Sequence, residues 1–143
     1  MSDEFSRLRE ALKKVDFFYS LSMGYLDELI RALKKRKAAK GEELIKQGEI
    51  GDKFYLISTG EVSVYVKKGG FGSPKKVATL GPGDFFGEMA LITDLPRAAT
   101  VIAEEPSEFF VLYKRDFKKI LMSNPKIAAI INDVLSKRRA SNR

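Results

Sequence analysis

The strongest constraint on the fold is the alternation of short β-favouring runs with glycine-containing turns through the middle of the chain. In VSVYV, Val62, Val64 and Val66 alternate with Ser63 and Tyr65, which is the two-residue period of a half-buried strand. Further strands are expected at residues 43–47, 53–59, 75–80, 98–103 and 107–113. Many short strands joined by glycine turns are typical of antiparallel barrels, so the sequence predicts a jelly-roll-like β-roll over about residues 34–113.

Helical periodicity flanks this β-rich region on both sides. Apolar residues at helical spacing predict helices over residues 3–14 and 22–33, the second capped by Ser22. The same spacing returns at residues 114–122 and again after Asn124, an expected N-cap, and Pro125, an expected first helical residue. The expected class is therefore α+β. One domain would span residues 1–143, with N-terminal helices over about 3–33 and C-terminal helices over about 114–139.

The composition removes several kinds of chemistry. The chain contains no cysteine and no histidine, which excludes disulfides, thiolate or imidazole metal sites, and catalysis by a histidine base or cysteine nucleophile. No signal segment or bilayer-length apolar run is visible, so we expect a cytoplasmic protein without a membrane segment. The net charge of +7 arises from scattered basic runs. A solvated surface is the simpler interpretation, and attraction to nucleic acid or anionic lipid is the alternative.

One segment interrupts the strand pattern, GDFFGEMALITDLPRAATV at residues 83–101. GEMAL favours helix, but Pro96 limits any helix here to about two turns. A helix start between strands offers backbone N–H groups to an anion, and Gly87 allows close approach to the backbone. Arg97 supplies a planar guanidinium for phosphate oxygens, while Glu88 suits a sugar hydroxyl. The alternative is a surface ion pair between Glu88 and Arg97 beside a turn.

The stretch FGEMALITDLPRAATV, residues 86–101, closely resembles the phosphate-binding cassette of cyclic nucleotide-binding domains. Such domains occur in regulatory subunits of cyclic-AMP-dependent protein kinase, in cyclic-nucleotide-gated channels and in catabolite-activator-type transcription factors. Residues 41–66 look like the early strands of the family, and residues 124–139 are similar to the hinge and lid helix of bacterial channel domains. The resemblance implies a cassette over residues 86–100 with a short helix, and hinge and lid helices at the C-terminus.

The resemblance also implies roles for individual residues. Glu88 would accept the ribose 2′-hydroxyl, and Arg97 would bind an exocyclic oxygen of the cyclic phosphate. The backbone N–H groups of Gly87, Ala90 and Ala98 would complete the anion cradle.

Four further positions match the family outside this set. Asp52 would orient the cassette arginine, with an ordinary turn aspartate as the alternative, and Val64 and Met89 would lie near the purine and ribose. Arg138 would stack on the base, with a solvated helix-end arginine as the alternative. Cyclic-GMP-selective kinase domains often carry threonine after the cassette arginine; alanine at position 98 therefore argues for cyclic AMP, with cyclic GMP as the second choice.

The expected function is ligand-gated regulation without catalysis, with no metal or other cofactor and with a cyclic nucleotide as the ligand. The effector is unknown, and the chain could be a fragment of a channel, a kinase regulator or a transcription factor. Nucleic-acid binding is not expected, because no helix-turn-helix follows the lid helix. A degenerate interaction module that has lost its ligand is a further alternative, and the RRAS stretch at 138–141 resembles a basophilic kinase site at Ser141.

Overall fold

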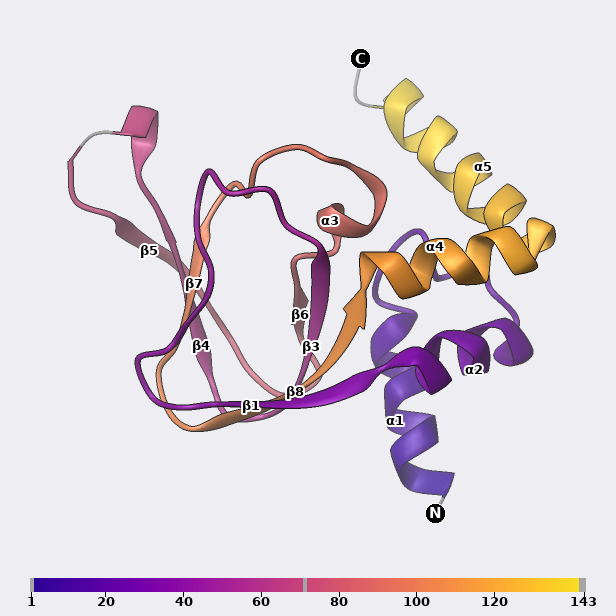
Figure 1. Ribbon diagram of the computed structural model, residues 1–143, viewed down its shortest axis with the longest axis horizontal. Coiled ribbons are helices and arrows are strands. Elements are labelled where there is room, and N and C mark those ends of the chain that lie inside the picture. The colour runs from indigo at the N-terminus through magenta and orange to yellow at the C-terminus, as the bar shows by residue number, and fades with distance from the viewer. Residues whose placement is uncertain (1, 71, 142–143) are drawn as a thin grey trace. The chain divides into compact units, whose positions relative to one another are not determined.

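The computed structural model describes residues 2–70 and 72–141, which fall into two compact units (Figure 1). The β-roll unit spans Lys34–Lys114, and the helical unit comprises residues 1–33 and 115–143. The prediction of one domain over the whole chain stays a prediction, and the two units are described separately below.

The β-roll unit consists of two antiparallel four-stranded sheets. Its strands are β1 (Lys34–Ala38), β2 (Glu43–Ile45), β3 (Lys53–Thr59), β4 (Val62–Val66), β5 (Lys75–Leu80), β6 (Phe85–Phe86), β7 (Thr100–Ala103) and β8 (Ser107–Tyr113). The first sheet has the order β1-β8-β3-β6, and the second has the order β2-β7-β4-β5. The predicted antiparallel β-roll is confirmed, and each expected strand is present with an end shifted by at most two residues.

The core of the roll is aromatic where β3, β6 and β8 meet. The Tyr55 ring stacks on Phe86 with centroids 4.7 Å apart, and it meets the edge of Phe109 at 5.7 Å. Such pairs add to the stabilisation that burial of their area provides. Phe86 is both the last residue of β6 and the first residue of the cassette, so this packing fixes the point from which the cassette leaves the sheet.

Strand β1 was not predicted, because its sequence, KKRKA, contains hardly any apolar residues. It pairs antiparallel with β8 and stands at the edge of its sheet. Only Ala38 is buried, and the lysines of the strand are exposed. A row of charged side chains on an edge strand is a common protection against pairing with other chains, which explains why a strand is built from these residues.

Within its described residues the helical unit contains four helices, α1 (Ser2–Leu12), α2 (Met23–Ala32), α4 (Lys114–Ser123, of which Lys114 belongs to the roll) and α5 (Pro125–Ser141). Ser22 caps α2 as predicted, with its Oγ accepting from the Tyr25 N–H at 3.3 Å. Helices α1 and α2 are joined by an ion pair in which Arg9 Nε donates to Asp27 at 2.8 Å. Phe17, Phe18 and Phe117 are fully buried in this unit.

Asn124 occupies the predicted N-cap position of α5, because its carbonyl accepts from the N–H groups of Ile127 at 3.0 Å and Ala128 at 3.3 Å. The prediction was wrong only for its side chain. Pro125 does open α5, but the Asn124 side chain donates from Nδ2 to the Ile120 carbonyl at 3.1 Å, so it serves the last turn of α4. An asparagine between two helices has free carbonyls behind it and free N–H groups ahead, and its amide can donate as well as accept. The sequence alone does not decide whether the Asn124 side chain bonds to the end of α4 or to the start of α5.

In the part of the chain that the structure describes, no helix combines the length and apolar character needed to cross a bilayer. The same residues contain no cluster of three or more metal-ligating side chains.

Candidate functional site

The cassette follows β6 as a tight turn, a single helical turn and an extended segment. Gly87 has a φ of 79°, in the left-handed region that favours glycine, and it turns the chain out of the sheet. The short helix α3 (Met89–Ile92) follows, and the Thr93 hydroxyl at its end donates to the Met89 carbonyl at 3.0 Å. Pro96 then holds the chain extended in a bridge to Ile50. The predicted short helix between strands is therefore present.

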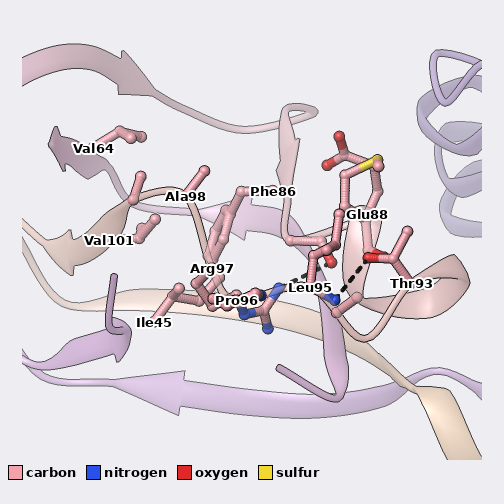
Figure 2. Close-up of a pocket in the computed structure, with 14 residues that line it drawn as sticks. Ile45, Val64, Phe86, Glu88, Thr93, Leu95, Pro96, Arg97, Ala98 and Val101 are labelled. Atoms are coloured by element: carbon pink, nitrogen blue, oxygen red, sulfur yellow. Dashed lines mark hydrogen bonds between the residues drawn. The ribbon is translucent and has the colours of Figure 1, made fainter. Parts of the chain in front are cut away.

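The cassette encloses one side of a pocket of about 350 Å³, called the cassette pocket below. Its wall is formed by Ile45, Val64, Phe86, Gly87, Glu88, Met89, Ala90, Thr93, Leu95, Pro96, Arg97, Ala98, Ala99 and Val101. Figure 2 shows Val64, Ala98 and Val101 at one end of this pocket and Glu88 and Thr93 at the other. Seven of the predicted ligand-binding residues thus line one cavity within the β-roll unit. Val64 reaches it from β4, on the second sheet.

The Arg97 side chain is directed into the protein and held by backbone carbonyls. Its Nη1 donates to the Gly87 carbonyl at 3.2 Å, and its Nη2 donates to the Lys53 carbonyl at 2.9 Å. Its backbone N–H donates to the Glu49 carbonyl at 2.7 Å. The residue is partly buried, so the guanidinium is fixed in the pocket wall.

Burial lowers the pKa of the Arg97 guanidinium from its ordinary value, and the nearby Tyr55, Asp52 and Glu88 act in the opposite direction. A guanidinium stays protonated at neutral pH despite such a shift. Arg97 therefore brings a permanent, partly desolvated positive charge to a wall that is otherwise largely apolar. Such a charge attracts an anion more strongly than an exposed one does.

Glu88 lies directly before α3, is partly buried, and also lines the pocket. Within the described residues it makes no ion pair with Arg97, whose guanidinium bonds go to carbonyl oxygens. In Figure 2 the Glu88 carboxylate and the Arg97 guanidinium point to different sides. The alternative of a surface ion pair is therefore not what this structure contains, and both residues line the pocket.

The backbone N–H of Ala90 was expected to face an anion, but in this structure it has a partner within the protein. This N–H donates to the Gly87 carbonyl at 3.2 Å, closing the first turn of the short helix. The Gly87 oxygen thus accepts from both Ala90 and Arg97. An N–H at the start of so short a helix finds a partner three residues back, which sequence patterns do not reveal.

Asp52 lies on the other side of Arg97, in a small polar hollow of about 110 Å³. This loop hollow is lined by Leu44, Ile45, Lys46, Glu49, Ile50, Gly51, Asp52, Lys53, Tyr55 and Arg97. The Asp52 carboxylate is 68% exposed and pairs with Lys53 Nζ at 3.0 Å. The direct partner of Arg97 here is the carbonyl of the next residue, Lys53, so in this structure Asp52 acts on the arginine only as a nearby charge.

Sequence reasoning missed the backbone groups that hold the site together. The Lys53 carbonyl carries no signal in the sequence, because every residue has one. Lys114 was also missed, although its Nζ donates to the Thr93 carbonyl at 2.9 Å and pairs with Asp94. Its backbone N–H donates to the Asp52 carbonyl at 2.8 Å, so Lys114 joins the end of the cassette to the loop before β3.

Arg138 and Ser141 lie on α5, and their side chains are outside the described residues. Their predicted roles, in stacking on a base and in phosphorylation, stay predictions.

The chain is similar to known proteins in both sequence and structure. The family model described as "Cyclic nucleotide-binding domain" matches residues 35–124. The chain is 35% identical over 119 residues, or 83% of its length, to a cAMP-dependent protein kinase regulatory subunit from Blastocladiella emersonii, of which it covers 29%. It is 36% identical over 136 residues, or 95% of its length, to a cyclic nucleotide-gated potassium channel from Rhizobium etli, of which it covers 36%.

Among solved structures, the regulatory domain of Toxoplasma gondii PKA co-crystallised with cAMP superposes with a TM-score of 0.73 at 29% identity. That match covers 98% of this chain and 51% of the other. The chain thus spans about a third of the length of the curated relatives that it matches.

Proposed function

The chain belongs to the cyclic nucleotide-binding domain family, and we propose that its cassette pocket binds cyclic AMP as a regulatory ligand. The observation that carries this proposal is the placement of a fixed, partly buried guanidinium, that of Arg97, in the wall of a pocket that also presents the Glu88 carboxylate.

Arg97 is the proposed phosphate ligand. A guanidinium has five N–H donors, and the bonds to Gly87 and Lys53 engage the two terminal nitrogens from the protein side. The remaining donors are available for an exocyclic oxygen of the cyclic phosphate. Because the two carbonyls already hold the group, the ligand does not have to order a flexible side chain when it binds.

Glu88 is the proposed sugar ligand. A carboxylate repels a phosphate but accepts hydrogen bonds from a ribose 2′-hydroxyl, and such charge-assisted bonds are the stronger kind. With Arg97 in the same wall, the pocket offers one group to each half of a sugar phosphate. Gly87 and Ala98 would bring their backbone N–H groups to the phosphate, and Met89 would lie beside the ribose.

The base is assigned to the apolar end of the pocket, at Val64, Ala98 and Val101. Position 98 offers a methyl group and no hydroxyl to the amino group of guanine, which favours adenine. The relative from Toxoplasma gondii, whose structure contains cAMP, supports the same choice.

The proposed role is regulation of an effector rather than turnover. The curated relatives named above are a kinase regulatory subunit and a channel, so their effectors differ although the matched domain is shared. Binding regulates only if the ligand prefers one of two conformations of the protein, since tight binding to both shifts nothing.

Calorimetric titration of the chain with cyclic AMP, cyclic GMP and 5′-AMP tests the proposal. We expect saturable binding of both cyclic nucleotides, tighter for cyclic AMP, and much weaker binding of 5′-AMP. At a hundred times its dissociation constant the ligand should raise the free energy of unfolding by about 2.7 kcal/mol. A flat titration with an unmoved melting curve would show a degenerate module, and tighter binding of cyclic GMP would overturn the choice of base.

A further inference from the structure

Gly51 lies against the guanidinium of Arg97 in the loop before β3. A Cβ atom built on this glycine would lie 2.0 Å from Arg97 Nε, 2.1 Å from Cζ and 2.5 Å from Nη2. Real Cβ atoms do not approach other heavy atoms so closely, so any side chain at position 51 would occupy the place of the guanidinium. The group therefore rests on a surface that exists only because residue 51 has no side chain.

The backbone conformation does not explain a glycine here. Gly51 is not among the glycines with a positive φ, so its backbone conformation is open to other residues. Gly60 is different, because its φ is 96° and an added Cβ would lie 2.7 Å from the Cα of Ser107. Gly60 is required by the fold, whereas at Gly51 the atoms in the way belong to the tip of one long side chain.

Three backbone features together hold the guanidinium, and we call them the guanidinium seat: the bare Cα of Gly51 and the carbonyl oxygens of Lys53 and Gly87. The two carbonyls accept from Nη2 and Nη1, and Gly51 leaves the space in which the planar group fits. The seat is also tight at Gly87, where an added Cβ would lie 2.9 Å from Nη1.

We propose that Gly51 is the positioning residue of the binding site: its missing side chain fixes Arg97 in the orientation that receives the phosphate. The proposal rests on the function proposed above. A methyl group at position 51 displaces the guanidinium, which is the free end of a flexible chain, while the strands around it stay in place. The result is a folded protein whose arginine is present but misplaced.

The chain offers a matched control for this substitution. Gly81 also lies in a loop of the β-roll unit, its φ is not positive, and an added Cβ would meet nothing within 4 Å. Gly81→Ala therefore makes the same chemical change with no steric consequence, and any general effect of replacing a loop glycine appears in both variants.

The first experiment compares Gly51→Ala and Gly81→Ala by calorimetric titration with cyclic AMP and by thermal melting without ligand. We expect Gly51→Ala to weaken binding about tenfold or more, because a misplaced guanidinium loses a charge-assisted bond, and Gly81→Ala to bind like the wild type. Both variants should melt close to the wild type. Wild-type affinity in Gly51→Ala overturns the proposal.

A double-mutant cycle separates positioning from a general structural effect. In an Arg97→Ala background the substitution Gly51→Ala should cost no further affinity, because the group that it displaces is already gone. An equal loss in both backgrounds, or melting of Gly51→Ala far below that of Gly81→Ala, would show that Gly51 serves the fold and would overturn the proposal.

A readout without ligand distinguishes this proposal from the function on which it rests. The Nε–H resonance of Arg97, identified by its loss in Arg97→Ala, reports the seat directly in the unliganded protein. We expect it to move in Gly51→Ala and to stay in Gly81→Ala. If the wild type does not bind nucleotide but this shift is seen, the proposed function is wrong, while the role of Gly51 in positioning Arg97 is supported. An unmoved resonance overturns the seat itself.

Discussion

The cassette pocket and the loop hollow share two wall residues, Ile45 and Arg97, but their other wall residues differ in polarity. The pocket is about three times larger and mostly apolar, with Glu88 at one end. The hollow is small and polar, and two of its charged side chains, Asp52 and Lys53, are paired with each other. The guanidinium of Arg97 can therefore be held by the protein and still bind a ligand. Backbone groups restrain it, and the larger apolar space beside it leaves room for an anion.

The test with the largest expected effect removes the side chain of Arg97, one of the two shared residues. Arg97→Ala should leave a partly buried phosphate without its partner, at a cost of about 2–5 kcal/mol, or about 30-fold or more in the dissociation constant for cyclic AMP. Calorimetric titration measures this loss. Arg97→Lys is the matched control, and it should recover little because an ammonium has the charge without the planar donors. Tight binding by the alanine variant would remove Arg97 from the site.

The next test acts on the pocket alone. Glu88→Gln replaces the charged acceptor by a neutral one and should weaken cyclic AMP binding about tenfold, since hydrogen bonds to charged groups are worth about 1.5–3 kcal/mol. The analogue 2′-deoxy cyclic AMP is the control. It lacks the hydroxyl, so wild type and variant should bind it alike. A tenfold difference with the analogue as well would mean that Glu88 does not contact the sugar.

A smaller effect is expected at the apolar end of the pocket. Ala98→Thr introduces a hydroxyl that the amino group of guanine can reach, and one such bond should shift the ratio of affinities about fivefold towards cyclic GMP. Competition between the two nucleotides for a fluorescent analogue measures the ratio directly. An unchanged ratio would place the base away from residue 98.

Nucleotide binding should tolerate loss of the Asp52 carboxylate from the loop hollow. Asp52 is mostly exposed and bonds to Lys53, and such pairs are worth about 0–1 kcal/mol, so Asp52→Asn should weaken cyclic AMP binding by about fivefold or less. A loss as large as that of Arg97→Ala would instead show that the Asp52 carboxylate takes hold of the arginine when the ligand arrives. Titration of both variants under the same conditions decides this.

A substitution in the helical unit should leave both cavities unaffected. The hydrogen bond from Arg9 lowers the pKa of Asp27, so the pair stabilises the fold above the ordinary Asp pKa of about 4 and is lost as the pH falls through the lowered value. Asp27→Asn should therefore reduce the loss of stability on acidification, measured by urea unfolding across this range. Affinity for cyclic AMP at neutral pH should be unchanged, and a weaker affinity would contradict this separation.

The sequence predicted the roll well where side chains alternate, as in the valines of β4, and the helices where apolar residues recur at helical spacing. It did not predict β1, because this lysine-rich strand forms by backbone pairing with β8 and not by burial of apolar side chains. The resemblance of the cassette placed Glu88 and Arg97 in one site, and the structure adds that Val64 reaches the same pocket from another sheet. The carbonyls of Lys53 and Gly87 and the bare Cα of Gly51 could not be foreseen, because contacts to main-chain atoms leave no trace in residue identity.

The Gly87 carbonyl, which accepts from both Arg97 and Ala90, couples a side chain to a backbone amide through one oxygen atom. If the bond from Arg97 to this oxygen changes, the hydrogen bond from the Ala90 N–H to the same oxygen changes in strength. The hydrogen-exchange rate of the Ala90 amide therefore reports on Arg97 without a label on either group. Slower exchange on addition of nucleotide would report, from the main chain, a binding event at a side chain seven positions further along.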